Sequence, residues 1–387
     1  MRRAATCLAV ALGVTFLGTG CGPKAATPDI GVGLLAELTG ELAAVGQSCK
    51  NGAELAAFDV NEGGGFRVGE EIHGIRLVVE DTASRPAAAA EAAQRLIADP
   101  KIVALIGPSA SLGALPVAAV AESSKILMIS PWSTHPSLTL DATTGQPRRY
   151  VYRACYTDDF QARFLARFAI DYERTKNAAI LYESNSEAPK TQAELFKKEF
   201  EALGGSVVAF EAYETGTKDF AALMKKVVEA KPEIVFLPNY YTDVAVQLKQ
   251  GREAGLKVPF LGSDNWNAEQ LLKLAPKEVE GSFFPGHYFP GARVDAVAKF
   301  VTTYKHRFGH DPDDVAALAY DSVVLLTRAM EAASAPAREP IREGMAKIPS
   351  FEGVTGKMTF RTADPIKSGA MLKASGGKIA FVTSIDP

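Results

Sequence analysis

Short apolar runs of strand length recur along the chain and alternate with segments of helical periodicity. Most of the runs are continuously apolar rather than alternating with polar residues, which is typical of parallel strands buried on both faces. We predict strands at residues 30–35, 75–79, 102–106, 126–129, 178–182, 207–210, 234–237 and 258–261.

The segments between these strands carry apolar residues at helical spacing, so we expect each of them to form a helix with one buried face. These helices are predicted at residues 87–98, 160–172, 192–203, 220–230 and 243–254. Three longer helical patterns follow at residues 296–308, 315–333 and 341–348, and short strand-like pieces close the chain around 358–360, 370–372 and 379–382.

The alternation of strand and helix stops and starts again in the middle of the chain. One run ends near Ser130 and another begins near Tyr150, with turn residues and weak periodicity at 136–147 between them. Strand and helix alternation at this pitch favours open sheets with right-handed crossovers. The sequence therefore predicts an α/β protein with two doubly wound, mainly parallel-sheet lobes and a cleft between them.

The beginning of the chain has the pattern of a secretory signal. Arg2 and Arg3 precede an apolar run at 8–17, and small residues lead from it to Cys21. The run is too short to span a bilayer as a stable anchor. Residues 17–21 resemble a bacterial lipobox, with Gly20 and Cys21 matching the motif and Gly18 standing where a leucine is usual. We expect a signal peptide over 1–21, export to the periplasm and a lipid anchor on Cys21; a plain cleaved signal with a chance cysteine is the alternative.

Bulk composition excludes several classes of protein. The 387 residues are 47% hydrophobic and 22% charged, which suits a soluble globular chain of two domains. A formal net charge of −3 without a long basic run gives no reason to expect a nucleic-acid partner, and no cofactor is expected. We expect a monomer. Export would permit a disulfide between Cys49 and Cys155, but two separate buried thiols are favoured.

Small polar residues follow three predicted strands of the first lobe. Thr39, Ser109 and Ser111, and then Ser133 and Thr134 supply hydroxyls and backbone N–H groups at these exits. Ligands of open α/β sheets bind at the carboxyl ends of strands, and helix N-termini there favour anions. Each of Thr39, Ser109 and Ser111 taken alone is more simply a helix cap, but the three exits together favour a carboxylate site.

The second lobe offers a different set of side chains at its strand exits. Asn239 and Tyr240 follow one strand, and Asp264 and Trp266 follow another. Asp264 is the only acid at these two exits and can pair with an ammonium group, to which Tyr240 and Trp266 could present ring faces. The alternative is that Asp264 or Asn267 caps the next helix. Anion donors in one lobe and a carboxylate in the other complement a free amino acid.

In the order and spacing of its motifs, the chain resembles a type I periplasmic solute-binding protein of the leucine/isoleucine/valine-binding branch of ABC importers. The resemblance covers nearly all of the chain after the signal. Its motifs are Gly31-Val32-Gly33-Leu34 with Leu38-Thr39-Gly40, residues 52–56, Ile106-Gly107-Pro108 with Ser111, residues 127–131 with Thr134, Lys218-Asp219-Phe220, Asn239-Tyr240-Tyr241, Leu261-Gly262-Ser263-Asp264 and residues 280–284.

The resemblance implies a role for the candidate residues. Ser111, Ser133 and Thr134 match positions that hold a ligand α-carboxylate, and Asp264 and Tyr240 match positions that hold the α-ammonium. It also implies a hinge of three crossing strands, expected near 152–155, 284–287 and 353–356. Lobe 1 would then comprise 28–152 and 288–352, and lobe 2 would comprise 153–287 and 353–387. A membrane permease is the implied partner.

Some pocket positions depart from the family pattern. Val45 and residues 187–188 stand where tyrosines are common, and Trp132 replaces a small residue, so that it either fills space or stacks on a flat ligand. Glu187 could favour a basic or amide-bearing ligand, or it could be a solvated loop residue. A ligand-sensing lipoprotein, or an importer component for amides, urea or aromatic acids, remains an alternative function. No nucleophile elbow or paired-histidine zinc motif indicates an enzyme.

Overall fold

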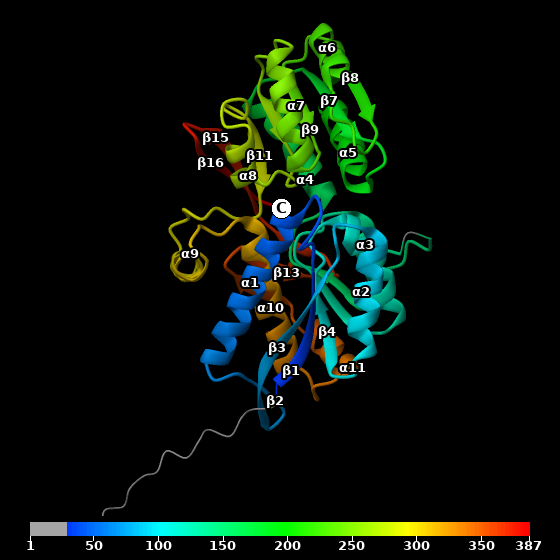
Figure 1. Cartoon of the computed structure of the whole chain (residues 1–387), viewed down its shortest axis with the longest axis vertical. Helices are drawn as coiled ribbons and strands as arrows, with labels where there is room; N and C mark the ends of the chain where they lie inside the picture. The colour runs from blue at the N-terminus through cyan, green and yellow to red at the C-terminus, as the bar shows by residue number, and fades with distance from the viewer. Residues whose placement is uncertain (1–28, 142) are drawn as a thin grey trace, which may run out of the picture.

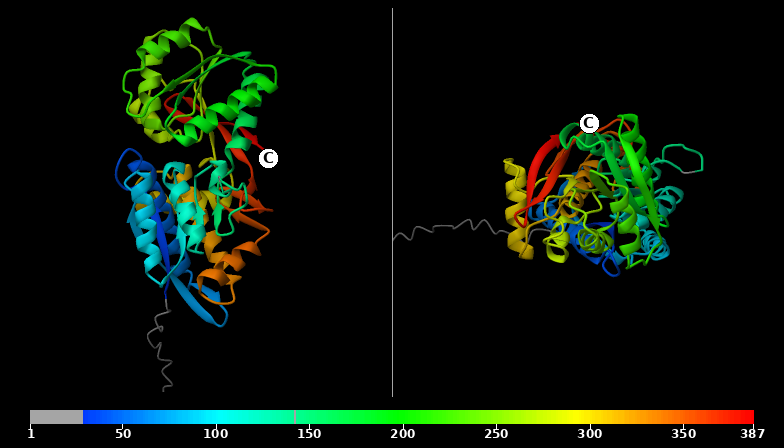
Figure 2. Two further views of the ribbon diagram at one scale, coloured as in Figure 1. Left: turned by 90° about the vertical axis from the view of Figure 1, so that its right-hand side faces the viewer. Right: turned by 90° about the horizontal axis from the view of Figure 1, so that it is seen from above.

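The computed structural model describes residues 29–141 and 143–387, which form two open α/β sheets and one small antiparallel sheet. The two large sheets lie in separate lobes placed end to end, as Figure 1 and the first view of Figure 2 show. The predicted α/β class is therefore confirmed. The expected signal segment and Cys21 lie outside the described residues.

The sheet of the first lobe has the strand order β2-β3-β1-β4-β5-β6, parallel throughout except for the hairpin of β2 and β3. Its strands are β1 (Asp29–Ala36), β2 (Phe66–Val68), β3 (Glu71–Asp81), β4 (Ile102–Ile106), β5 (Leu127–Ser130) and β6 (Val151–Arg153). The helices between them are α1 (Ala43–Glu62), α2 (Pro86–Ala98) and α3 (Ser111–Ser123), and a 3-10 turn, η1 (Pro136–Leu138), precedes β6.

The sheet of the second lobe has the order β16-β15-β11-β10-β9-β7-β8, in which only β15 runs antiparallel to its neighbours, β11 and β16. Its strands are β7 (Asn177–Glu183), β8 (Ser206–Tyr213), β9 (Ile234–Leu237), β10 (Phe260–Gly262), β11 (Phe283–Gly286), β15 (Gly369–Ser375) and β16 (Lys378–Ile385). Its helices are α4 (Asp158–Arg167), continued by the π-helical turn η2 (Phe168–Tyr172), α5 (Glu187–Ala202), α6 (Ala221–Glu229), α7 (Tyr241–Glu253) and α8 (Ala268–Leu274).

After β11 the chain returns to the first lobe. There it forms α9 (Asp295–Phe308), α10 (Asp314–Glu331), α11 (Arg338–Ala346), β12 (Ser350–Gly353), β13 (Gly356–Phe360) and β14 (Pro365–Lys367). Helix α10 packs along α1, so the blue and orange helices lie side by side in Figure 1. All eight strands and the eight helical segments predicted from periodicity are present, with ends that differ by a few residues.

The chain passes between the two large sheets three times. The first two passages follow β6 and β11, near the segments expected from the sequence. The third passage was expected at 353–356 and lies instead between β14 and β15. Residues 353–356 form the hairpin turn between β12 and β13, where Gly356 has a φ of +92°. The Asp321 carboxylate of α10 accepts the backbone N–H groups of Val354 and Thr355, which holds this turn against the first lobe.

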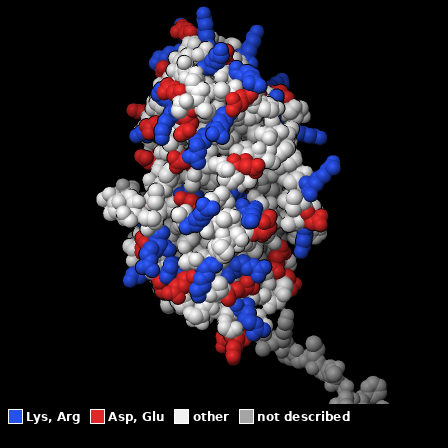
Figure 3. All heavy atoms as spheres, turned by 180° about the vertical axis from the view of Figure 1, so that it is seen from behind, with Lys and Arg blue, Asp and Glu red and all other residues white. Residues whose placement is uncertain are grey.

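The buried residues of both lobes are mostly apolar, as expected of a globular protein. Cys49 and Cys155 are separate buried thiols, as predicted. On the face shown in Figure 3, basic and acidic side chains are interspersed. Within the described ranges, no helix combines the length and apolar character needed to cross a bilayer.

Arg153, the last residue of β6, is fully buried where the first passage begins. Its guanidinium donates to the backbone oxygens of Ser133 at 2.7 Å and His135 at 3.0 Å, and its Nε pairs with Asp364 at 2.6 Å. One side chain therefore fixes the loop after β5 and ties it to the loop before β14. Removing one partner of a buried ion pair leaves an uncompensated charge and unpaired acceptors.

We predict that Arg153→Met lowers the free energy of unfolding by about 3 to 5 kcal/mol, the scale for breaking a buried pair. Urea unfolding followed by circular dichroism measures this change. Arg95→Met is the matched control, because Arg95 pairs with Glu80 on the surface and exposed pairs contribute little. Equal unfolding midpoints for the two variants would contradict the role assigned to Arg153.

Candidate functional site

Polar side chains meet at the strand ends where the order of each sheet reverses. In the first lobe this point lies between β1 and β4, and the Glu37 carboxylate after β1 accepts the N–H of Ala110 after β4 at 3.0 Å. In the second lobe it lies between β7 and β9, where the Asn239 side chain accepts the N–H of Glu183 at 3.0 Å. Such switch points are where open α/β sheets bind ligands. The two sheets turn these ends toward each other.

The wall of the first lobe carries a pair of serine hydroxyls. Ser111 is the first residue of α3 and Ser133 follows β5, and their Oγ atoms lie 2.9 Å apart. Ser111 is 5% exposed, and Ser133 and Thr134 are buried. The structure therefore brings three of the predicted carboxylate-binding residues together at one helix N-terminus. Neighbouring hydroxyls and N–H groups at such a position suit an anion.

Asp264 stands on the opposite wall and is 1% exposed. Its Oδ1 accepts Nε2 of Gln161 at 2.8 Å and Nε2 of Gln192 at 3.0 Å. Its Oδ2 has no hydrogen-bond partner in the described part of the chain and faces His287 Nε2 at 3.5 Å. Asn267, not Asp264, caps helix α8. The carboxylate is thus oriented by two amides and keeps one oxygen for another partner.

Asp158 connects the two walls and was not anticipated from the sequence. Its N–H donates to the Thr134 backbone oxygen at 3.0 Å, and its Oδ1 accepts the same Gln192 amide group that binds Asp264. Burial and the nearby Asp264 charge raise the pKa of Asp158 to about 7, although hydrogen bonds from Gln192 and Thr134 oppose the shift. Two carboxyl groups therefore share one buried site beside the serine pair.

Two aromatic rings complete the neighbourhood of Asp264. Tyr156 and His287 stack with their ring centroids 3.9 Å apart, and both are buried. Burial lowers the pKa of His287, so that its neutral form is favoured. The Tyr156 hydroxyl, His287 Nδ1 and Asp158 Oδ2 have no hydrogen-bond partner among residues 29–141 and 143–387, and His287 Nε2 has only the long contact of 3.5 Å to Asp264 Oδ2. Buried polar atoms usually have partners, so this group marks a place where a ligand would supply them.

The other predicted residues take different positions. Thr39 is exposed, and its hydroxyl binds Asp81 at 2.6 Å, so the structure does not bring it to the serine pair. Ser109 is buried beside the Cys49 thiol. Asn239 is used within its lobe, since its amide donates to Leu181 O and Gln247 Oε1. Thr39 and Asn239 therefore form their hydrogen bonds within their own lobes, whereas the buried Ser109 hydroxyl has no hydrogen-bond partner among the described residues.

The predicted aromatic residues are all buried near the interface between the lobes. Burial, and then the Asp264 charge, raises the pKa of Tyr240, which places it within electrostatic reach of that carboxylate. Trp132, between the loop's Pro131 and Ser133, keeps its Nε1 without a partner in the described ranges. Trp266 donates to Leu237 O at 2.9 Å and packs over Gly262. Glu187 is exposed in the first turn of α5, which fits its solvated interpretation.

Besides the bond from Asp158 N–H to Thr134 O, side-chain hydrogen bonds between described residues join the lobes around this site. His135 Nε2 and Thr191 Oγ1 are hydrogen-bonded at 3.0 Å. Tyr241, the first residue of α7, donates to Glu41 O at 3.2 Å, and Asn267, in the loop before α8, donates to Asp313 at 3.0 Å. The lobes are thus closed on each other, which is why the candidate residues are buried. No group of three or more metal-ligating side chains occurs within the ranges that the structure covers.

Comparison with known proteins agrees with this arrangement. Residues 29–376 match the family model described as periplasmic binding protein. A Leu/Ile/Val-binding protein of Rhizobium johnstonii is 30% identical over 66% of this chain and 67% of its own length. The leucine-binding protein LivK of Thermotoga maritima shares the fold with a TM-score of 0.84 at 30% identity, over 92% of this chain and 99% of its own.

A third similar protein was solved with a ligand. The branched-chain amino acid transporter substrate-binding protein LivJ of Streptococcus pneumoniae, in complex with isoleucine, has a TM-score of 0.85 at 27% identity, over 93% of this chain and all of its own. The two-lobed fold, the opposed polar walls and the match over most of the chain lead to one conclusion. This chain belongs to the periplasmic binding protein family.

Proposed function

We propose that this protein is the extracytoplasmic solute-binding component of an ABC importer and that it binds a free amino acid between its lobes. The observation that carries the proposal is the Asp264 carboxylate, which is 1% exposed, oriented by Gln161 and Gln192, and left with an unpartnered oxygen within the described chain. A buried charge needs a charged partner, and an ammonium group supplies one.

The ligand's two charged groups are assigned to the two walls. Its carboxylate would accept hydrogen bonds from Ser111, Ser133 and Thr134 at the start of α3 and after β5, where the helix N-terminus favours an anion. Its ammonium would donate to Asp264 and to the neighbouring Asp158, with Tyr240 nearby. Hinge closure between the lobes then removes both charges from water together.

The family and its named members support the class of cargo. Two of the similar proteins carry leucine or Leu/Ile/Val binding in their names, and a third holds isoleucine. A permease that recognises the closed lobes is the partner this function requires. An amide, urea or an aromatic acid as cargo would leave Asp264 without an ammonium to bind, and the first experiment below distinguishes these cargos from an amino acid. A sensing role would use the same site; neighbouring permease and ATPase genes indicate transport, and a neighbouring kinase or regulator gene indicates sensing.

We predict that Asp264→Ala weakens amino-acid binding by about 3 kcal/mol, because it removes one partner of a buried charged pair. A thermal-shift screen of the twenty amino acids selects the ligand, since binding to the folded state raises its stability. Calorimetry then gives the two affinities. Asp171→Ala, at an exposed position of the same lobe, is the matched control. An affinity within threefold of the wild type would reject the role of Asp264.

A pH dependence should follow from Asp158. With a pKa of about 7, it takes up a proton as the pH falls and then no longer attracts a cation. Affinity for the amino acid should therefore drop by about tenfold between pH 8 and pH 6, as expected for one linked proton. Asp158→Asn should flatten this dependence. A steep dependence that persists in the variant would show that another group is responsible.

We also propose that the protein is exported and anchored through a lipid on Cys21. Cys21→Ser should move it from the membrane fraction to the soluble periplasmic fraction, because a thioether-linked lipid can no longer form. Cys7→Ser, within the expected signal, is the matched control and should leave the protein in the membrane fraction. Fractionation with immunoblotting measures both, and a soluble wild-type protein would contradict the anchor.

A further inference from the structure

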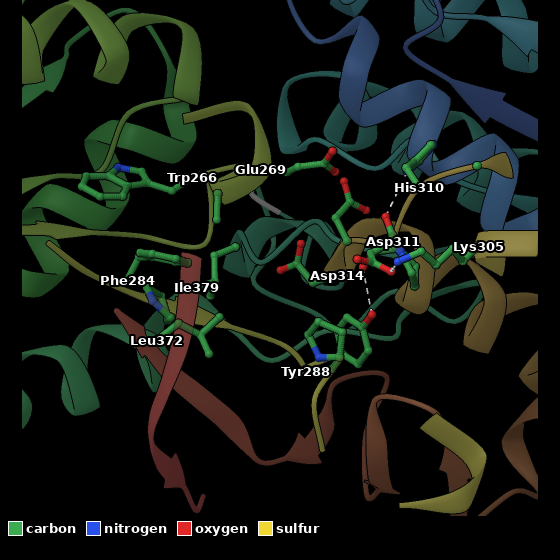
Figure 4. Close-up of a pocket in the computed structure, with 16 residues that line it drawn as sticks. Trp266, Glu269, Phe284, Tyr288, Lys305, His310, Asp311, Asp314, Leu372 and Ile379 are labelled. Atoms are coloured by element: carbon green, nitrogen blue, oxygen red, sulfur yellow. Dashed lines mark hydrogen bonds and ion pairs between the residues drawn. The ribbon is translucent and has the colours of Figure 1, made fainter. Parts of the chain in front are cut away.

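A second cavity of about 400 Å³ lies between the lobes, and none of Ser111, Ser133 and Asp264 lines it. The second lobe supplies an apolar wall that consists of Trp266, Phe284, Leu372 and Ile379. The first lobe supplies a polar wall from the end of α9, the loop after it and the start of α10. Figure 4 shows the apolar side chains on one side of the cavity and Lys305, His310 and Asp311 on the other, with Asp314 between them.

The cavity carries an excess of negative charge. Four carboxyl groups and one ammonium line it: Glu269, Asp311, Asp313, Asp314 and Lys305. Lys305 pairs with Asp311 at 3.0 Å, and Glu269 pairs with Lys273 at 2.8 Å. The ion pairs found in the described ranges therefore leave Asp313 and Asp314 without a cation.

Neutral donors hold these two carboxyl groups in place. Asp313 accepts Ser48 Oγ at 2.8 Å and Asn267 Nδ2 at 3.0 Å, and it caps α10 through the N–H of Ala316. Asp314 accepts backbone N–H groups, including that of His287. Burial raises the pKa of both aspartates. A cation in the cavity would stabilise their charged forms.

We propose that this cavity is a second binding site, for a small organic cation with an apolar body. The ammonium would lie beside Asp313 and Asp314, and the apolar body would rest against Phe284, Leu372 and Ile379. The rings of Trp266 and Tyr288 border the cavity and can add cation–π attraction. A volume of about 400 Å³ is within the range of small-molecule sites. The polarity of the two walls sets the orientation of the ligand.

The site exists only when the lobes are together. Its two walls come from different lobes, and the hydrogen bond from Asn267 of the second lobe to Asp313 of the first lies at its edge. A ligand that binds one arrangement better shifts the population toward it. Occupation of this cavity would therefore favour the closed arrangement without contact with the serine pair.

The test uses three probes with the same aromatic body. Calorimetry of the purified protein with 2-phenylethylamine, 2-phenylethanol and 3-phenylpropionate compares a cation, a neutral molecule and an anion. The amine should bind at least about tenfold more tightly than the alcohol, which is the scale of one or two desolvated cation contacts. The anion should bind more weakly than both. Equal affinity for the amine and the alcohol would overturn the charge preference and with it the proposal.

Variants locate the binding and separate it from the amino-acid site. Ala268→Phe places a ring in the cavity from the half-buried start of α8 and should abolish amine binding. Asp313→Asn, which keeps a capping side chain, should weaken amine binding at least about fivefold. Asp264→Asn should weaken amine binding less than Asp313→Asn does, because Asp264 does not line the cavity and acts on Asp314 only through its charge. Amine binding that is lost in Asp264→Asn and retained in Ala268→Phe would mean that the probe occupies the amino-acid site, which overturns the second site but not the proposed function.

Discussion

A carboxylate buried between two lobes without a cationic partner is the constraint on which the rest of the structure depends. Asp264 is almost fully removed from water, and its position is fixed by Gln161 and Gln192 rather than by an opposite charge. A charge in this state is costly, because hydrogen bonds from neutral amides replace only part of its hydration. We propose that a ligand with a positive charge makes the arrangement favourable and thereby couples closure of the lobes to binding.

The two sheets produce this arrangement by placing their switch points face to face. Each sheet turns its strand ends toward the other lobe, and at each switch point a polar side chain bridges the two strands, Glu37 in one lobe and Asn239 in the other. The side-chain amide of Asn239 is fully hydrogen-bonded within its lobe, so the residue after it, Tyr240, rather than Asn239 can face the other lobe. Arg153 then fixes the loop that carries Ser133, whose hydroxyl we propose binds the ligand's carboxylate.

Much of the fold could be predicted from the sequence because it depends on local periodicity. Continuous apolar runs predicted the parallel strands. Their polar exits indicated Ser111, Ser133 and Asp264 as ligand-binding residues; the structure buries all three, and their binding roles stay predictions. Local periodicity could not show that the Thr39 hydroxyl lies away from the serine pair. That hydroxyl donates a hydrogen bond to Asp81, which is more than forty residues away in the sequence. The family resemblance implied a third passage, which was expected at 353–356; these residues instead form the hairpin turn between β12 and β13, and the passage follows β14.

Asp158, Gln161, Gln192, Tyr156 and His287 were missed for a related reason. They lie in helices and connecting segments that can be predicted from their apolar residues alone, so the pattern gives these polar residues and rings no role. Only the tertiary fold brings them close to Asp264. The only local indication of a role for Asp158 was its place in an Asp-Asp pair at the start of α4. Acidic residues are also favourable in the first turn of any helix, so the pair did not predict a binding site. Contacts between residues more than thirty positions apart carry no periodic signature.

The most direct test of this account removes the positive charge from the ligand rather than the negative charge from the protein. Calorimetry on the wild-type protein would compare the best-binding amino acid with the carboxylic acid that has the same side chain and no amino group. The account predicts that loss of the ammonium weakens binding by at least about a hundredfold, the scale of leaving one buried charge unpaired. Equal affinities for the two compounds would show that Asp264 does not bind the ligand's ammonium and would contradict the central claim.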